Sequence, residues 1–139
     1  MIKTTGEMTT EEKQQLFYFI APAELHDSLG EYNPGRGRSG YIDGRWIGGI
    51  VFHGDTNILS GGVVEDIRDT GVWIDLWMDV ISWSLTVHPQ IVMTITEKPI
   101  ADLMMKMGAV AMVKTMYCYE VYFKRDETLA LLESKDWTA

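Results

Sequence analysis

The segment EDIRDTGVWIDL, residues 65–76, contains the residue types that could bind a phosphate group. Arg68 and Gly71 form an Arg-x-x-Gly turn, which follows an apolar run and precedes a helical pattern that begins at Val72. The first amides of a helix lack partners within the helix, and the helix dipole favours an anion there. The segment therefore predicts either a phosphate-binding turn or an ordinary helix start.

Two carboxylates stand directly before this turn. Glu65 and Asp66 belong to the apolar run ILSGGVVEDI, residues 58–67, which we expect to be a strand, so their side chains should point to opposite faces. One of them would face a cleft and could act as a general base toward an amine, directly or through water. The alternative is that both are ordinary solubilising residues at a strand end.

The N-terminal region predicts helices followed by a loop. Thr9 and Glu12 have capping-box spacing before an apolar face, which indicates a helix over residues 10–20. Pro22 can open a short second helix. The stretch EYNPGRGRSG, residues 31–40, is dense in Gly and Pro and predicts a loop that could border a ligand site.

A small basic cluster lies in and after this loop. Its members are Arg36, Arg38 and Arg45. Such a cluster is either a solvated surface feature or an anion site.

The middle of the chain predicts a three-stranded meander. Asp43 and Gly44 are typical of a two-residue hairpin turn, and a clear strand over residues 45–53 follows. A second turn over residues 54–57 leads into the run 58–67, whose paired glycines indicate a bulge or a bend.

The second half of the chain alternates helices and strands. Polar residues spaced by three and four over 72–86 predict a helix with a narrow polar stripe, whose tryptophans we expect in the core. A short strand follows in HPQIVMTIT, and the next helix has Thr96 as a candidate cap and Pro99 in its first turn. Gly108 stands where this helix should end.

Residues 109–124 alternate and predict one long or two short strands, and TLALLESK predicts a final short helix. The predicted order is ααβββαβαβ(β)α. It indicates an α/β (α+β) fold with a mixed, largely antiparallel central sheet flanked by helices.

Composition narrows the function classes. A chain of 139 residues predicts a single domain, and its net charge of -8 argues against nucleic acid and anionic membranes as partners. One cysteine and no long apolar run predict a cytoplasmic protein. The three histidines lack the spacing of a metal site, so we expect no metal.

The order of elements, the Arg-x-x-Gly turn before the long helix and the later Lys-x-Gly helix end resemble the GNAT superfamily of N-acetyltransferases. The resemblance covers about residues 41–124, with N-terminal helices and a loop in 1–40 and a C-terminal helix and tail in 127–139. It implies one GNAT-like domain over residues 1–139. More narrowly, the chain is similar to small GNAT-like proteins of tailed phages, some of which are described as internal virion or head-assembly proteins.

The resemblance implies acetyl-CoA as the cofactor. In the family, backbone amides of the sequence Arg/Gln-x-x-Gly-x-Gly/Ala bind the pyrophosphate, and the last position is small. The residues at these positions here are Arg68, Asp69, Thr70, Gly71, Val72 and Trp73, of which Arg68 to Gly71 match the first half of the motif. The large Trp73 departs from the pattern, and Asp69 places a negative charge beside the expected anion.

A second family motif is also incomplete. Its tyrosine often protonates the departing thiolate, and Met104 stands at that position in EKPIADLMMKMGA, although Lys106 and Gly108 match. Tyr117 or Tyr119 could replace the missing acid, although aromatic packing is the alternative use for both.

Two functions follow from this resemblance. The first is an acyl-CoA-dependent N-acyltransferase that acetylates a primary amine, with Glu65 or Asp66 as base, Tyr117 as a candidate acid and a degenerate cofactor motif. The second is a non-catalytic phage head-assembly or interaction protein, located in the host cytoplasm or the virion. The partners left open are an unknown small-molecule or protein amine, a second copy of the chain and a virion-assembly partner.

Overall fold

The computed structural model of the chain describes residues 1–21, 30 and 32–134. Its contacts form two compact units. The first unit comprises Met1–Thr56 and Gly61–Val80, and the second comprises Asn57–Ser60 and Ile81–Ala139. The helix predicted from Pro22 lies outside the described residues.

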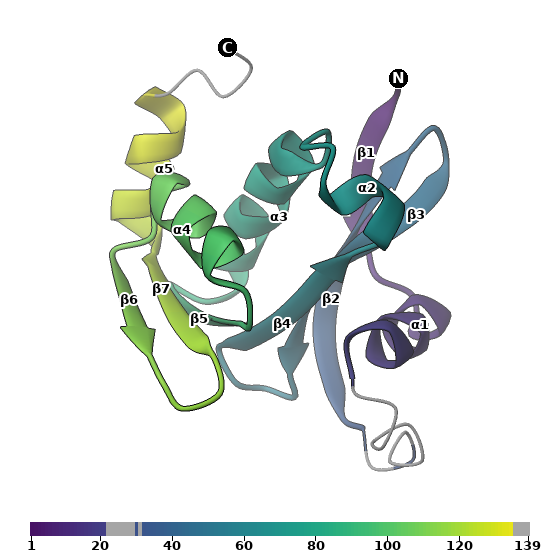
Figure 1. Cartoon of the computed structure of the whole chain (residues 1–139), viewed down its shortest axis with the longest axis horizontal. Coiled ribbons are helices and arrows are strands. Elements are labelled where there is room, and N and C mark those ends of the chain that lie inside the picture. Colours follow the sequence, from purple (N-terminus) through teal and green to yellow (C-terminus); the bar gives the residue numbers. More distant parts are fainter. Residues whose placement is uncertain (22–29, 31, 135–139) are drawn as a thin grey trace. The chain divides into compact units, whose positions relative to one another are not determined.

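The first unit is built on three antiparallel strands. Its elements are β1 (Lys3–Glu7), α1 (Thr10–Ile20), β2 (Pro34–Ile42), β3 (Arg45–His53), the end of β4 (Ile58–Val63), α2 (Glu65–Arg68) and the beginning of α3 (Ile74–Val87) (Figure 1). The hairpin between β2 and β3 turns at Asp43 and Gly44, whose φ values of 50° and 81° confirm the predicted turn.

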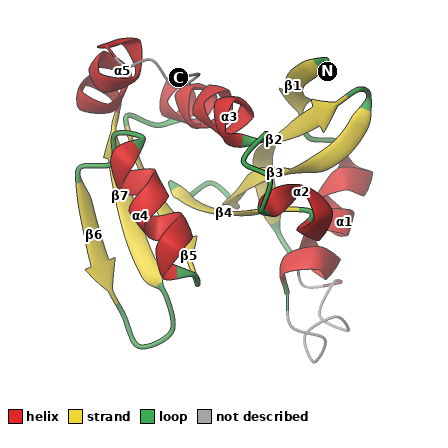
Figure 2. Cartoon of the chain, turned by 45° about the horizontal axis from the view of Figure 1, so that its top comes forward, coloured by secondary structure: helices red, strands yellow, loops and turns green. Residues whose placement is uncertain are grey.

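The second unit combines strands of both directions. Its elements are the start of β4, the end of α3, β5 (Gln90–Ile95), α4 (Lys98–Lys106), β6 (Ala111–Lys114), β7 (Tyr119–Lys124) and α5 (Arg125–Ser134) (Figure 2). β4 and β5 are parallel at Ile58 and Leu59, whereas β7 is antiparallel to both β5 and β6. Residues 109–124 thus form two short strands.

The hydrogen-bonded order of the seven strands is β1-β2-β3-β4-β5-β7-β6. The parallel pair β4–β5 beside the antiparallel pairs β1–β2, β2–β3, β5–β7 and β6–β7 confirms the predicted mixed, largely antiparallel sheet with flanking helices. None of the described helices is long and apolar enough to cross a membrane.

The predicted loop over residues 31–40 is wrong, because Pro34–Ile42 is a strand. This strand pairs on one side with β1, which the sequence analysis did not predict. β1 reads KTTGE and has no alternation of apolar residues, so only its pairing reveals it. The glycines of β2 serve close packing, since a Cβ at Gly37 would lie 2.8 Å from the Ile50 carbonyl oxygen.

The predicted basic cluster is divided among separate partners. Arg36 forms an ion pair with Glu7, and the Nε of Arg38 donates to the Thr5 hydroxyl at 3.2 Å. These bonds join β2 to β1 and leave neither arginine as part of a free anion site.

Paired glycines let β3 and β4 approach closely in the first unit. A Cβ at Gly48 would lie 2.0 Å from the carbonyl oxygen of Gly62, and one at Gly61 would lie 2.5 Å from that of Gly49. A Cβ at Gly62 would lie 2.6 Å from the ring of Phe19 on α1. Because no side chain fits at these distances, only glycine allows the three elements to pack together.

α4 begins differently from the prediction. Its N-cap residue is Glu97 rather than Thr96, and no side chain caps the helix, although Pro99 does lie in the first turn. The helix ends as predicted at Gly108, whose φ is 109°. The hydroxyl of Thr128 on α5 donates to the Gly108 carbonyl at 2.8 Å, so this end is also tied to the C-terminal helix.

Glu12 joins α1 to the strands. It completes the predicted capping box with Thr9, and the same carboxylate accepts from the Ser39 hydroxyl at 3.1 Å and the Tyr41 hydroxyl at 2.6 Å. Ser39 is fully buried and also accepts from the Trp46 indole at 3.0 Å. Burial, followed by the hydrogen bond and charge of Glu12, raises the pKa of Tyr41.

We expect Glu12→Ala to lower the free energy of unfolding by about 2 kcal/mol, because it removes the capping box and leaves a buried hydroxyl without its acceptor. Urea unfolding followed by circular dichroism measures the change. Glu11→Ala is the matched control, since Glu11 lies in the same first turn and is exposed. Equal loss in both variants would contradict the role given to the Glu12 network.

Candidate functional site

β4 ends at Val63, and after the single residue Val64 the chain enters α2 at Glu65. The amides of Ile67 and Arg68 both donate to the Val64 carbonyl, at 3.1 Å and 3.0 Å, and so close a helical turn. Glu65 and Asp66 are therefore the first residues of a short helix, and the prediction that they end a strand is wrong. The sequence analysis missed the change from strand to helix because Glu65 and Asp66 stand between apolar residues, and an apolar pattern alone does not locate the end of a strand.

The turn that follows is organised by Thr70. Its amide and hydroxyl both donate to the Ile67 carbonyl, at 3.0 Å and 2.6 Å, and the hydroxyl accepts from the Val72 amide at 3.3 Å. Gly71 then takes a φ of 74°, which a residue with a side chain rarely adopts. The predicted sequence of turn and long helix is confirmed, with α3 beginning at Ile74.

Two amides in this turn remain available. Among the described residues, the backbone N–H groups of Gly71 and Trp73 have no hydrogen-bond partner. Both lie directly before the first turn of α3, which is 14 residues long. Unpaired amides and the positive end of the helix dipole together favour an anion at this position.

The Trp73 side chain packs into the interior of the first unit. It is 2% exposed, and its ring meets that of Trp77 edge-on at 5.4 Å between centroids. Its indole N–H donates to the Arg68 carbonyl at 2.7 Å and so braces the turn from within. The predicted core role of both tryptophans is confirmed, and the indole is directed away from solvent.

Ion pairs offset part of the negative charge near the turn. Arg45 binds both carboxylate oxygens of Asp66, at 2.7 Å and 2.8 Å, and Lys3 binds Asp75 in the first turn of α3 at 3.1 Å. Glu65 and Asp69 are exposed. The hydrogen bonds from Arg45 hold the pKa of Asp66 below its usual range, so this carboxyl is a weaker base than an unpaired one.

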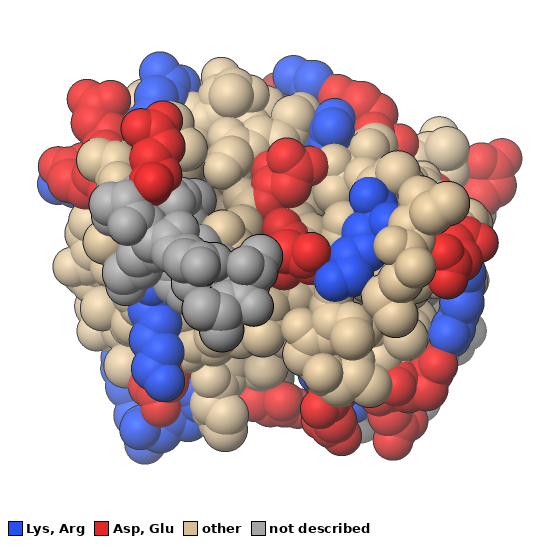
Figure 3. All heavy atoms as spheres, turned by 90° about the horizontal axis from the view of Figure 1, so that it is seen from above, with Lys and Arg blue, Asp and Glu red and all other residues tan. Residues whose placement is uncertain are grey.

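The face seen from above in Figure 3 carries acidic and basic side chains next to one another. On the described part of that face, no extended basic area dominates.

The other predicted site residues lie in the second unit. Tyr117 is 86% exposed in the turn between β6 and β7, and Tyr119 is half-buried on β7. Met104, at the position of the family tyrosine, is fully buried. The phenol of Tyr117, which was predicted as the acid, has no hydrogen-bond partner among the described side chains.

A polar pair on β7 was missed by the sequence analysis. The Tyr122 hydroxyl donates to the Glu120 carboxylate at 3.2 Å, and both side chains are half-buried. Burial, then the charge and hydrogen bond of Glu120, raise the pKa of Tyr122 and keep its phenol protonated. The spacing of two residues on a strand was a usable signal, because it places both side chains on one face.

Several solved structures with the same architecture are acetyltransferases. A GNAT family acetyltransferase from Elizabethkingia anophelis with acetyl-CoA bound matches with a TM-score of 0.61 and 14% identity, covering 88% of this chain and 97% of that chain. A spermidine N-acetyltransferase chimera from Vibrio cholerae and hSSAT matches with a TM-score of 0.60 and 11% identity, covering 92% of this chain and 98% of that chain. The PaiA N-acetyltransferase from Thermoplasma acidophilum in complex with coenzyme A matches at 0.58 and 9%, covering 89% and 99%.

The chain has the GNAT acetyltransferase fold. No protein-family model and no curated protein sequence matches it. At these identities the likeness establishes the GNAT fold alone, so an activity has to be argued from the site.

We expect Trp73→Ala to destabilise the protein by about 3–5 kcal/mol, because it empties a large buried volume. Trp73→Phe keeps the ring contact, loses the bond to Arg68 and should cost about 1 kcal/mol. Urea unfolding measures the loss of stability in each of the two variants. Val72→Ala, at a half-buried residue of the same turn, is the control. A stable Trp73→Ala protein would show that the turn does not depend on the indole.

Proposed function

We propose that the protein is an N-acyltransferase that moves an acetyl group from acetyl-CoA to a primary amine in the cytoplasm. The observation that carries the proposal is the pair of unpartnered amides of Gly71 and Trp73 before α3. Acetyl-CoA would supply an activated thioester carbonyl for the amine to attack, together with a pyrophosphate that suits such amides.

In this proposal, some groups of the turn stabilise its conformation and others bind the cofactor. The residues proposed to surround the pyrophosphate are Arg68, Asp69, Thr70, Gly71, Val72 and Trp73. Within this set the Thr70 hydroxyl is engaged inside the turn, and the Val72 amide bonds to it. Binding would therefore fall mainly to the amides of Gly71 and Trp73, and the Asp69 charge would weaken it.

Glu65 is the preferred candidate for the general base. It is exposed at the start of α2, whereas Asp66 is engaged by Arg45 and has a lowered pKa. A base that removes the amine proton, directly or through water, needs an accessible carboxylate that is not already bound to a cation. Asp66 remains as the second candidate of the pair.

Tyr117 is the proposed acid, and Tyr122 is the alternative because its phenol stays protonated. Met104 cannot serve in the role of the family tyrosine, since a thioether carries no proton to donate.

A non-catalytic role is the second candidate function. The fully buried Met104 in place of a tyrosine favours it, as does the negative charge of Asp69 beside the turn. In this case the GNAT fold would serve a phage head-assembly or other interaction role, in the host cytoplasm or the virion, and the turn would be a structural remnant.

Calorimetric titration with acetyl-CoA and with CoA tests the cofactor proposal. We expect micromolar binding in the native protein and loss of binding in an Arg68→Ala, Gly71→Val variant, because the new side chain disturbs the positive-φ residue between the two amides. Gly44→Val is the matched control, since Gly44 also has a positive φ of 81° in an open turn. Absence of heat with the native protein at millimolar ligand would reject the transferase.

A thiol-release assay with a panel of primary amines tests the base. We expect Glu65→Gln to lower kcat/KM by about 10²–10⁴-fold while CoA binding by calorimetry is kept. Glu11→Gln is the control for loss of an exposed carboxylate in a first helical turn. Unchanged turnover in Glu65→Gln would transfer the role to Asp66, tested as Asp66→Asn.

A further inference from the structure

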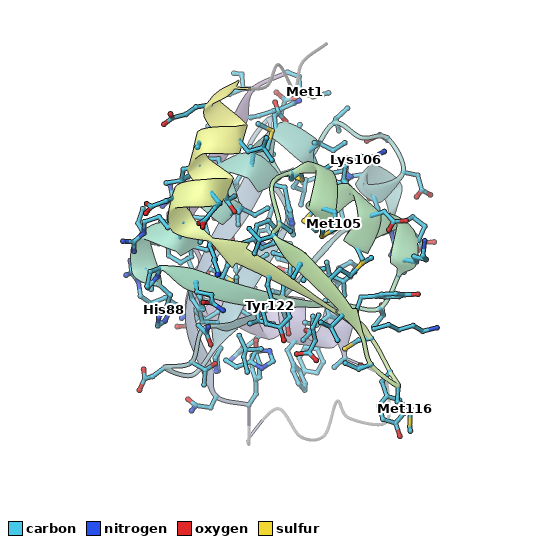
Figure 4. The ribbon with its side chains drawn as sticks, turned by 90° about the vertical axis from the view of Figure 1, so that its left-hand side faces the viewer. Met1, His88, Met105, Lys106, Met116 and Tyr122 are labelled. Atoms are coloured by element: carbon cyan, nitrogen blue, oxygen red, sulfur yellow. The ribbon has the colours of Figure 1, made fainter. Side chains whose placement is uncertain are left out.

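An apolar surface surrounds the edge strand of the second unit. The exposed large hydrophobic side chains between residues 110 and 117 are Val110 at 41%, Val113 at 49%, Met116 at 86% and Tyr117 at 86%. Figure 4 shows Met116 at the far end of the β6–β7 hairpin, away from Met105 and Lys106. Such a concentration of exposed apolar side chains within one hairpin is typical of an interaction surface.

The backbone of β6 is paired on one side. β6 ends the strand order next to β7, so among the described strands its other edge has no partner. The strand is four residues long, and Lys114 is the only charged residue in it. Exposed strand edges of this kind pair readily with a further strand.

The hydrogen-bond pattern shows which groups point outward. The Thr115 amide donates to the Cys118 carbonyl at 2.8 Å, in the same register that pairs Val113 with Glu120. Bonded pairs alternate along an antiparallel ladder, so Val113 directs its backbone groups toward β7. The N–H and C=O groups of Met112 and Lys114 therefore point to the open edge.

We propose that a second copy of this chain adds its β6 to this edge, antiparallel and with a two-fold axis at Val113. In this register Met112 of one copy pairs with Lys114 of the other, and the reverse, so all the outward groups of both residues are bonded. The two Val113 side chains then meet in a non-bonded pair, whose Cα atoms are about 4.5 Å apart.

This occupant fits the edge for two reasons. The register is self-complementary, as a two-fold interface requires, and no like charges stand opposite each other. It also brings Met116 of one copy beside Val110 of the other, so that exposed apolar side chains of the two copies meet. The short strand predicts a concentration-dependent dimer, strengthened by salt because each chain carries a charge of -8.

Disulfide cross-linking tests the register in a Cys118→Ser background, which removes the native thiol. Val113→Cys should give a covalent dimer under mild oxidation, because its self-pair lies within the distance that a disulfide spans. Ala111→Cys is the matched control on the same strand and face: its opposite residue in the partner is Thr115, so it should stay monomeric. Equal cross-linking of both variants, or none in either, would overturn the proposal.

Light scattering of the uncross-linked protein provides the second test. The native chain should approach twice its 15.8 kDa mass as concentration rises. Val113→Asp should weaken the dimer by about tenfold, because two carboxylates then meet at the axis. A mass of one chain at every concentration would reject self-pairing. Calorimetric titration of Val113→Asp with CoA measures cofactor binding separately, so that loss of the dimer is distinguished from failure of the cofactor proposal.

Discussion

The close approach of β3 and β4 at their paired glycines is the constraint on which the first unit depends. With a Cβ at Gly48 or Gly61, the neighbouring carbonyl would be at only 2.0–2.5 Å. The same contact region lets α1 reach Gly62, and the β4 backbone then stays bound to β3 as far as the Val64 amide, which donates to Ile47. That bond marks where the chain can leave the sheet and enter α2, and so determines where the candidate turn begins.

In the turn, residues that stabilise its conformation stand next to the two amides that we propose as cofactor ligands. Thr70 and the Trp73 indole satisfy groups within it, which keeps its conformation without a ligand. The amides of Gly71 and Trp73 are left over by that arrangement. A large residue at position 73 is compatible with anion binding because its side chain is buried while its amide is not engaged. The size of the Trp73 side chain alone therefore does not rule out an anion at the proposed site.

Elements with a strong local signal were predicted well. The capping box of α1, the Asp43-Gly44 turn and the left-handed end of α4 at Gly108 all rest on short-range chemistry, and all three occur. Failures came where pairing decides the structure. Nothing in KTTGE marks a strand, and the glycines of residues 34–42 mark a loop until the neighbouring strand explains them.

Apart from β1, β2 and α2, the sequence by itself determined the element types, together with the mixed sheet and the position of the Arg68 to Gly71 turn, because periodicity, caps and turn residues act over a few positions. Tertiary structure alone decided that Glu65 and Asp66 lie on a helix, that Arg45 lowers the pKa of Asp66 and that Trp73 faces inward. These facts depend on contacts between distant segments. The spacing of residues along the sequence does not predict which distant segments will be in contact.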